Sequence, residues 1–501
     1  MLPLILALFL SWLPLSPQSV DGESTSESSF GNRIALSFDS LNDEADKRQI
    51  LAEASEIGID IIHFTRSDQL TATNIEDFLL IYQFPNDYTT VNSLRTRSEE
   101  FTADIRNSLQ TLMVQYPDKI ISAGLFRYPN EQHPQFNAFA TQIADNIREF
   151  SGLPLFYQSA LSGDSLYTDY TESFDFTVQT VIPGDNTPTA NALFFDPGKN
   201  VQESKKTLEN LFKKTLELDE SLLIIPADWF QDYVAGNDDY KTIFSEYLAG
   251  NLLPFPIPQT PETPPSIHWN VVFLFLILGS ILLHMRFQPV YIQALPRYFF
   301  NHSFFLVDVI EHRIRNIFPG ILILIQHSVV TGLILYLTAD SLFNERSLDT
   351  LAHHFPALFW TANPYVSLFF SGFFISLIMQ IISVLWLHLP NKKLQFFSQT
   401  LNLYAWPLHI NFLVATVLIV FHNQSPGQTL IYVLLASYLI VWFMSFNVAA
   451  YDATKFLEKY SLPYILFTIG LHTLLFIFFI WFAIYSPAIS EPMQMALSFS
   501  P

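Results

Sequence analysis

The side chains that could do chemistry in this sequence stand at the ends of eight short apolar runs in the first half of the chain. The polar residues at or just after these ends are Asp39, His63, Gln83, Arg127, Gln158, Gln179, Asp196 and Asp228. Their aromatic neighbours are Tyr82, Tyr128, Tyr157 and Trp229. Carboxylates and amides hydrogen-bond sugar hydroxyls, and aromatic planes stack on the apolar faces of pyranose rings. The pattern therefore predicts a carbohydrate-binding site.

Two carboxylates could extend such a site to catalysis, because hydrolysis of a glycosidic bond needs one protonated and one ionised carboxyl group. Glu131, in the loop FRYPNEQHP, and Asp196, at the end of the seventh run, could form this pair. Asp39 and Asp228 are the other candidates. The alternative for each residue is an ordinary structural role in capping a helix or solvating a loop. A barrel that binds glycan without cleaving it, or a purely structural domain, accounts for the sequence equally well.

Motifs for other reaction classes are missing from the sequence. The chain contains no Cys, which excludes disulfides, thiolate catalysis and Cys-ligated metal sites. His63 and His133 are not spaced as a pair of metal ligands on one helix, so we expect no metal site and no cofactor. The sequence has no G-x-G-x-x-G, P-loop, G-x-S-x-G or H-E-x-x-H segment, and it gives no support for dinucleotide enzymes, NTPases, common α/β-hydrolases or zincins.

The apolar runs that carry these residues predict strands of a parallel sheet, because several are nearly continuous in Val, Ile, Leu and Phe. We expect strands at 33–39, 59–64, 78–84, 120–127, 153–159, 174–182, 192–196 and 222–227. Amphipathic segments predict helices at 42–57, 92–115, 135–150, 201–218 and 238–249. This alternation predicts a (β/α)8-like barrel over residues 33–250. An incomplete barrel or another parallel α/β sheet is the alternative.

The segment Asp46–Ile62, DKRQILAEASEIGIDII, resembles the first helix and second strand of glycoside hydrolase barrels. The similarity extends over about Arg33–Gly250 through the strand-end pattern, and Trp229 is similar to the aromatic residue that often lies under the reactive sugar in that family. The resemblance implies carbohydrate binding and, where two carboxylates converge, hydrolysis. In retaining members the catalytic carboxylates follow strands four and seven. This chain has Arg127 at the end of run four, so Glu131 would have to supply the first of them.

The second half of the chain is apolar and almost uncharged. Residues 1–268 hold 16 of the 25 basic and 38 of the 46 acidic residues, a net charge of −22, whereas residues 269–501 have a net charge of +1. This acidic balance offers no basic surface to phosphate, so we exclude nucleic acid as a partner. Six apolar segments of spanning length predict an all-α transmembrane bundle in the lipid bilayer: 269–285, 317–339, 364–388, 402–421, 429–450 and 463–485.

The basic residues of this half alternate by side. Eight of its nine Lys and Arg residues fall in the loops 286–316, 389–401 and 451–462, which the positive-inside rule places in the cytoplasm. The barrel, as part of residues 23–267, and the C-terminal tail are then expected outside the cytoplasm. A short apolar core near the N-terminus is typical of a signal peptide and predicts the same side. We therefore expect a multi-pass protein of the inner (cytoplasmic) membrane of a bacterium.

The expected domains are a signal peptide (1–22), a flexible leader (23–32), the barrel (33–250), a Pro-rich linker (251–267), the six-span domain (268–487) and an extracytoplasmic tail (488–501). Polar residues inside the spans are costly in lipid and could line a solute path, or could tie helices together: His327, His409, Asn411 and His472. The run of spans is faintly similar to Yip-type multi-span domains. A second function thus stays open, a transporter or envelope-assembly component whose barrel is structural or binds a membrane-protein partner.

Overall fold

The computed structural model describes residues 32–39, 41, 43–70, 75–160, 173–183, 190–198, 201–218, 221–256, 269–422, 428–457 and 460–499. These residues form two compact units, a barrel and a helical bundle, each with its own hydrophobic core. The predicted signal peptide, nearly all of the predicted leader and most of the predicted linker lie outside the described residues.

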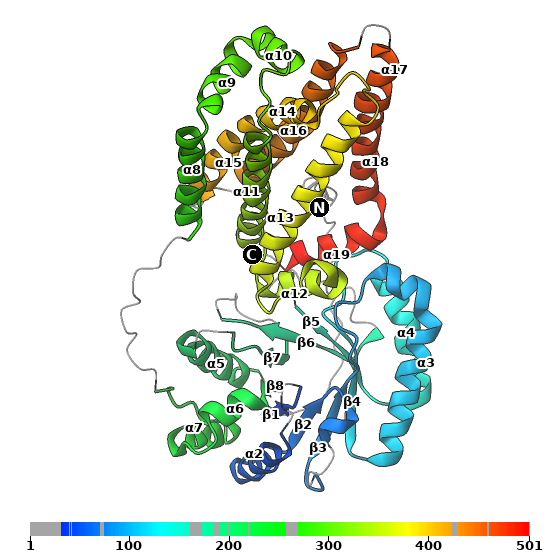
Figure 1. The fold of residues 1–501 in the computed structure, drawn as a ribbon. Coiled ribbons are helices and arrows are strands. Elements are labelled where there is room, and N and C mark those ends of the chain that lie inside the picture. Colours follow the sequence, from blue (N-terminus) through cyan, green and yellow to red (C-terminus); the bar gives the residue numbers. More distant parts are fainter. Residues whose placement is uncertain are drawn as a thin grey trace. The chain divides into compact units, whose positions relative to one another are not determined.

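Eight parallel strands close into a barrel, in which each strand pairs with the next and β8 pairs with β1 (Figure 1). The strands are β1 (Asn32–Ser37), β2 (Ile61–Phe64), β3 (Leu79–Gln83), β4 (Ile120–Arg127), β5 (Leu155–Ser159), β6 (Phe176–Val181), β7 (Ala192–Phe195) and β8 (Ser221–Pro226). The predicted barrel is confirmed, and each predicted strand overlaps an observed strand.

Helices surround the strands: α2 (Glu44–Ile57), α3 (Val91–Gln115), α4 (Phe136–Ser151), α5 (Val201–Leu216), α6 (Ala227–Tyr233) and α7 (Asp238–Leu248). The described parts of the connections from β5 to β6 and from β6 to β7 contain no helix. The barrel helices that the structure describes therefore follow β1, β3, β4, β7 and β8.

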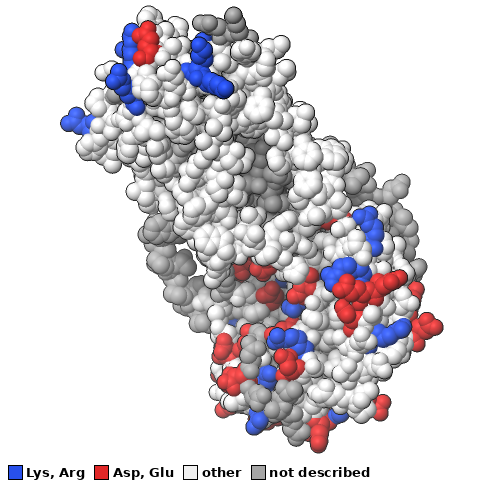
Figure 2. Space-filling model, turned by 45° about the vertical axis from the view of Figure 1, so that its right-hand side comes forward, with Lys and Arg blue, Asp and Glu red and all other residues white. Residues whose placement is uncertain are grey.

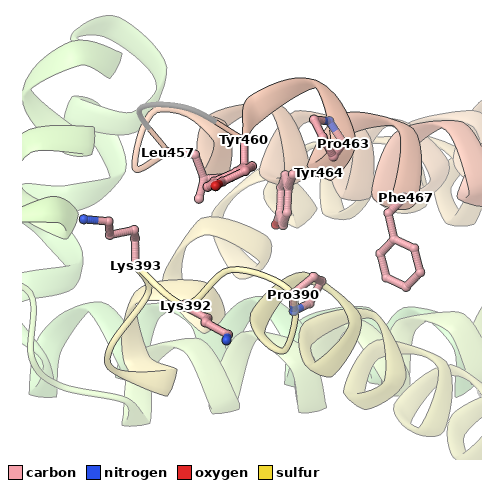
Figure 3. A pocket seen from close by; sticks show the side chains of 8 residues that line it. All are labelled: Pro390, Lys392, Lys393, Leu457, Tyr460, Pro463, Tyr464 and Phe467. Carbon is pink, nitrogen blue, oxygen red and sulfur yellow. The ribbon is translucent and has the colours of Figure 1, made fainter.

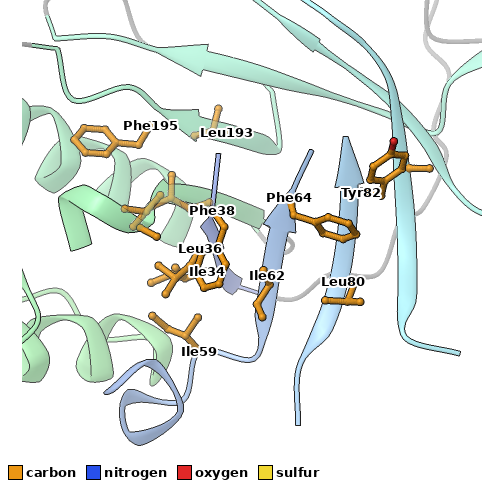
Figure 4. Packing of buried hydrophobic residues seen from close by; sticks show 14 of the residues in the cluster. Ile34, Leu36, Phe38, Ile59, Ile62, Phe64, Leu80, Tyr82, Leu193 and Phe195 are labelled. Atoms are coloured by element: carbon orange, nitrogen blue, oxygen red, sulfur yellow. The ribbon is translucent and has the colours of Figure 1, made fainter. Parts of the chain in front are cut away.

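Alternating side chains on the strands form two separate apolar layers. The layer inside the barrel consists of Ala35, Ile61, Ile81, Phe156, Val178, Ala192, Phe194, Leu222 and Ile224. The side chains between them in sequence point outward and pack against the helices, as Figure 4 shows for Leu36, Ile62 and Leu80. Because side chains alternate with a period of two, this division fixes which strand residues face the barrel interior.

The first residues of the predicted linker belong to the barrel. Phe255 is buried, and its ring lies 5.5 Å from that of Phe212 on α5 and 5.7 Å from that of Tyr240 near the start of α7. The Tyr240 hydroxyl also donates to the Pro256 carbonyl at 3.4 Å. Phe255 and Pro256, in the described start of the predicted linker, therefore pack with the barrel.

The second unit is entirely helical. Its elements are α8 (Trp269–Phe287), α9 (Pro289–Phe300), α10 (His302–Ile310), α11 (Phe318–Leu342), α12 (Glu345–His354), α13 (Pro364–His388), α14 (Phe397–Ala405), α15 (His409–His422), α16 (Gln428–Thr454), α17 (Ser461–Ile465), α18 (Leu471–Tyr485) and α19 (Pro487–Ser498). A 3-10 turn joins α14 to α15, and a π-helical turn joins α17 to α18.

Five helical segments of this unit are long and apolar enough to cross a membrane: Phe318–Leu342, Pro364–His388, Phe397–His422, Thr429–Thr454 and Ser461–Tyr485. A sixth crossing exists if α8 and α9, which meet at a bend of 106°, count as one span. On the face shown in Figure 2, the sides of the bundle are almost free of charge. These features define a multi-pass membrane protein and agree with five of the six predicted spans as single helices.

The predicted tail is largely helical in the structure. α19 packs against α12, and Met493 and Ala496 of α19 are fully buried. Asn344, which caps the start of α12, also donates its side-chain amide to the Phe499 carbonyl. The segment after the last span is therefore packed into the core of this unit.

The closest helix pair of the bundle, α11 with α13, depends on two glycines. A Cβ at Gly332 would lie 2.5 Å from the Phe369 carbonyl oxygen, and a Cβ at Gly372 would lie 2.9 Å from the Gly332 Cα. Both obstructing atoms belong to the backbone, so they cannot turn aside as a side chain can. Small residues of this kind let helix backbones approach within a membrane.

We predict that Gly332→Ala and Gly372→Ala each destabilise the bundle by about 1–3 kcal/mol, because the added methyl must push two packed helices apart. Thermal unfolding of the detergent-solubilised full chain measures the effect. Gly279→Ala on α8 is the matched control, since a Cβ there meets nothing within 4 Å. Equal midpoints for all three variants would contradict the tight α11–α13 contact.

Candidate functional site

A polar layer lies above the apolar interior of the barrel, at the carboxyl ends of the strands. Five of its members each lie two positions after a residue of the inner apolar layer, on the same strand or strand end, and therefore also face inward: Ser37, His63, Gln83, Gln158 and Thr180. They bond to each other, with the Ser37 hydroxyl 2.9 Å from His63 Nδ1 and Gln158 Nε2 donating to Thr180 Oγ1 at 2.9 Å. The carboxyl end is where barrels of this type build their sites from loops.

Arg127 joins this layer through an irregularity in β4. The pairing of β4 with β5 matches Gly124 to Phe156 but Arg127 to Gln158, so β4 has one extra residue between them. This bulge turns Arg127 to the inner side, where strict alternation would have placed its neighbour Phe126. The position of Gly124 allows close packing, because a Cβ there would lie 2.2 Å from Gln83 Oε1.

The guanidinium of Arg127 bridges two acidic residues at the barrel mouth. Its Nη1 lies 3.1 Å from Asp39 Oδ2, and its Nε lies 3.8 Å from Asp87 Oδ1. Arg127 and Asp39 are partly open, with side-chain exposures of 20% and 17%. The ion pair therefore lies at the edge of the mouth, although both Asp39 carboxylate oxygens and Arg127 Nε are themselves buried.

Two tyrosines flank Arg127 in unusual backbone conformations. Tyr88 and Tyr128 have φ values of 54° and 52°, in the left-handed region that is costly for residues with a side chain. Their rings lie 5.5 Å apart, and the Arg127 guanidinium lies 5.3 Å from the centre of the Tyr128 ring. The Tyr88 amide donates to the Arg127 carbonyl at 2.9 Å, which ties the loop after β3 to the end of β4.

His63 is a neutral member of the polar layer. Burial lowers the pKa of His63 to about 4, while Asp39 opposes this shift and Arg127 adds to it. Its ring also meets Phe194 of the inner apolar layer edge-on at 6.1 Å. At neutral pH the imidazole therefore offers one donor and one acceptor without a charge.

Several buried polar atoms around this layer have no hydrogen-bond partner within the described part of the chain. They are Asp39 Oδ1, Gln83 Oε1, Asn86 Nδ2 and Asn130 Nδ2. Asp39 Oδ2 and Arg127 Nε also make no hydrogen bond there, but both take part in ion pairs. Buried polar groups in proteins are nearly always bonded to protein, water or a ligand. Asn86 and Asn130 lie on the loops after β3 and β4, so this unmet bonding capacity is concentrated on one part of the mouth.

Glu131 lies outside the barrel wall. Its Oε1 accepts a hydrogen bond of 2.5 Å from the Ser159 hydroxyl, and Tyr157 also bonds to its carboxyl group. Tyr157 belongs to the outer core, and Ser159, two positions further along β5, lies on the same side of the strand. Glu131 and the inward-facing residues are therefore on opposite sides of this strand. Burial raises the pKa of Glu131 to about 7, and its two hydrogen bonds oppose the shift.

The other predicted site residues do not join the polar layer. Gln179 follows the inward-facing Val178, points outward and accepts from the Ala190 amide at 3.3 Å. Asp196 accepts from the Gly198 amide at 3.2 Å in the loop after β7, and Asp228 accepts from the Trp229 amide at 2.8 Å in the first turn of α6.

Trp229 is 4% exposed and belongs to the outer core. Its ring lies 5.3 Å from that of Phe195 and 5.2 Å from that of Tyr233. These two rings cover the indole of Trp229. Tyr88, beside Arg127, is only partly buried. The structure thus presents a tyrosine at the mouth, in a loop that the search for strand ends did not reach.

The polar residues predicted inside the spans form hydrogen bonds between helices. His327 on α11 bonds to the Tyr438 hydroxyl at 3.2 Å, and Asn411 on α15 donates to the Tyr438 carbonyl at 3.0 Å. His409 bonds to the Tyr291 hydroxyl of α9, and His472 on α18 lies 3.2 Å from Asn447 Oδ1.

Two of these contacts lie well apart along α16. Tyr438 and Asn447 are separated by nine residues of that helix, or about 13 Å along its axis. His327 and Asn411 therefore share a site around Tyr438, whereas His472 belongs to a different level of the bundle.

No protein-family model matches this sequence, and no curated protein is similar to it. The fold and the apolar helices define the class, a multi-pass membrane protein with a closed eight-stranded parallel barrel. Because barrels of this kind host many unrelated chemistries, the activity has to be inferred from the site itself.

The raised pKa of Glu131 leads to a pH-dependent prediction. The folded state holds the proton up to about pH 7 and the unfolded chain only to about pH 4.5, so stability falls as pH rises between these values. Glu131→Gln removes this titration. We predict that wild type loses about 2–3 kcal/mol more than this variant between about pH 5 and about pH 8.

Urea unfolding of the full chain in detergent, followed by far-ultraviolet circular dichroism at both pH values, measures this difference. Glu149→Gln is the control, because Glu149 is an exposed glutamate on the nearby helix α4. Parallel pH profiles for wild type and Glu131→Gln would contradict the buried, proton-holding state of Glu131.

Proposed function

We propose that the barrel binds a neutral or amino sugar of the cell envelope at the carboxyl ends of its strands, and that the bundle holds this domain at the membrane. The observation that carries the proposal is the cluster of buried polar atoms around the Asp39–Arg127 ion pair, several of which make no hydrogen bond within the described residues. A hydroxyl-rich ligand can donate to Asp39 and Gln83 and can accept from Asn86 and Asn130.

The charge and the aromatic surface of the mouth favour this class of sugar. Asp39, Arg127 and Asp87 together carry one net negative charge, and Asp196 and Asp228 stand at the ends of neighbouring strands. This balance disfavours sialic and uronic acids and tolerates an ammonium group. The partly exposed ring of Tyr88 supplies a face on which a pyranose can stack.

Binding without hydrolysis is the mode that the carboxylates support. Hydrolysis requires an acid and a second carboxylate on either side of one glycosidic bond. Glu131, the buried glutamate whose pKa is raised, lies outside the wall, whereas Asp39 and Asp87 share one guanidinium inside the mouth. The resemblance to glycoside hydrolases then reflects a sugar site that lacks the catalytic pair.

The charge of the bundle supports a barrel on the outer side of the membrane. Nearly all Lys and Arg residues of the second half lie in loops that the order of the spans puts on one side of the membrane, which the positive-inside rule assigns to the cytoplasm. The barrel precedes the first span and therefore lies on the opposite side. A transporter is less well supported, because the intramembrane histidines occupy separate contacts and no described span has a convergent polar path through them.

We predict that neutral or amino oligosaccharides of the cell envelope raise the unfolding midpoint of the full chain in a detergent without a sugar headgroup. A ligand at about 100 times its Kd adds about 2.7 kcal/mol to the native state. Asp39→Asn and Arg127→Gln should abolish the shift, because each removes one member of the ion pair that faces the ligand. Mass spectrometry of the same samples should find no cleaved sugar.

The matched controls are Glu53→Gln and Lys241→Gln. Each breaks the 3.0 Å ion pair between Glu53 on α2 and Lys241 on α7. The side chains of Glu53 and Lys241 are 15% and 21% exposed, which is close to the values for Asp39 and Arg127. A shift that persists in Asp39→Asn and Arg127→Gln, or is lost equally in the controls, would place the sugar elsewhere. Cleaved products would argue for an enzyme.

The proposed sidedness can be tested with single cysteines, since the natural chain contains none. We predict that Glu56→Cys, on the exposed surface of α2, reacts with a membrane-impermeant maleimide in intact spheroplasts. Lys392→Cys, in the loop after α13, should react only after the membrane is permeabilised. The opposite labelling pattern would reverse the orientation, and the cysteine-free chain is the blank.

A further inference from the structure

A hollow of about 640 Å³ lies at one end of the bundle, between the loop that follows α13 and the start of the last span (Figure 3). One wall is formed by Pro390, Lys392 and Lys393. The facing wall contains Tyr460, Tyr464 and Phe467 (Figure 3). None of the predicted site residues lines it, and it is independent of the barrel.

Buried hydrogen bonds fix both walls. The Tyr464 hydroxyl donates to the Leu387 carbonyl at 2.9 Å and so ties the last span to the end of α13. The fully buried Asn391 donates its side-chain amide to the Ala453 carbonyl at 2.9 Å and anchors the lysine-bearing loop to α16. The hollow is therefore a built feature of the bundle, with walls that come from three helices.

The walls combine charge with apolar surface. The described lining residues include two lysines and no carboxylate, and neither Lys392 nor Lys393 makes an ion pair within the described residues. By contrast, Lys455 on α16 lies 3.1 Å from Asp452. Among the residues that the structure describes, the hollow thus places two lysines beside aromatic side chains.

The apolar wall continues onto a surface that faces lipid. Leu462, Leu466 and Phe467 are about half exposed or more, although they belong to the spanning segment Ser461–Tyr485. An acyl chain can lie along this surface and still belong to a molecule whose headgroup reaches the lysines. A small soluble anion would use the lysines alone and would leave the aromatic wall without a role.

We propose that this hollow is a binding site for an anionic phospholipid. The headgroup phosphate lies between Lys392 and Lys393 at the membrane surface, and the acyl chains pack along Tyr464 and Phe467. Basic pockets between spanning helices on the cytoplasmic side favour anionic headgroups, by roughly a factor of five for each lysine near the surface. Neutralising both lysines should therefore weaken binding roughly 30-fold.

The experiment uses the full chain, delipidated in detergent and titrated with dioleoylphosphatidylglycerol while native mass spectrometry counts bound lipid. Dioleoylphosphatidylcholine has the same chains without the net charge, and glycerol 3-phosphate has the phosphate without the chains. The test variant is Lys392→Gln/Lys393→Gln. Its charge-matched control is Arg286→Gln/Arg315→Gln, because both arginines are exposed and lie outside the hollow, Arg286 in the last turn of α8 and Arg315 before α11.

The expected result is tight binding of phosphatidylglycerol to wild type and to the arginine control, with a loss of roughly 30-fold in the lysine variant. Phosphatidylcholine should bind wild type as weakly as phosphatidylglycerol binds the lysine variant. Equal affinity of wild type and the lysine variant for phosphatidylglycerol would overturn the site. Displacement of phosphatidylglycerol by equimolar glycerol 3-phosphate would make it a site for soluble phosphate and overturn the lipid assignment.

Discussion

Both halves of this chain depend on one constraint, that a polar group removed from water must find a partner within the protein or in something the protein binds. In the bundle the constraint is met locally. Tyr438 bonds through its hydroxyl to His327 and to Thr331, and through its carbonyl to Asn411. These contacts join three helices and leave the lipid-facing sides of the bundle apolar. In the barrel the same constraint is met only in part, because several buried polar atoms at the mouth make no hydrogen bond within the described residues.

The barrel mouth owes its composition to strand alternation and to one exception. Closure of β1 on β8 fixes which residues of β1 face the barrel interior. Ala35, Ser37 and Asp39 alternate on this inner side, so Asp39 lies at the mouth above the apolar layer that contains Ala35. The bulge in β4 then brings Arg127 to the same side as Gln158. Without that extra residue the guanidinium would lie among the helices, and Asp39 would face the mouth without a cation.

The sequence predicts the elements well because apolar periodicity reports burial directly. The strands, five of the six helices around them and five of the six spans follow from this signal, whereas the short helix α6 was not predicted. It predicts the site less well, because a shift of one residue moves a side chain to the other face of a strand. Gln179 was expected at the mouth, whereas its neighbour Thr180 faces inward. Continuing the alternation upward from Val178 would have identified Thr180, and from Ala35 it would have identified Ser37.

Other features depend on contacts that no local pattern contains. Trp229 is of the residue type that stacks on sugars, but the packing of α6 against β7 brings Phe195 against its ring. Glu131 stands four residues beyond Arg127, and its orientation is set by Ser159 on the next strand. The bulge in β4 is visible only in the pairing of β4 with β5.

The left-handed tyrosines show where the barrel stores strain. At Tyr88 and Tyr128 the positive φ costs on the order of 1 kcal/mol each. Tertiary contacts hold Tyr128 in this conformation, because its side chain is buried and its hydroxyl accepts a hydrogen bond from Gln158 Nε2 at 3.2 Å. Relaxing the backbone at Tyr128 would cost the polar layer this hydrogen bond, so the strained loop and the polar layer are energetically coupled.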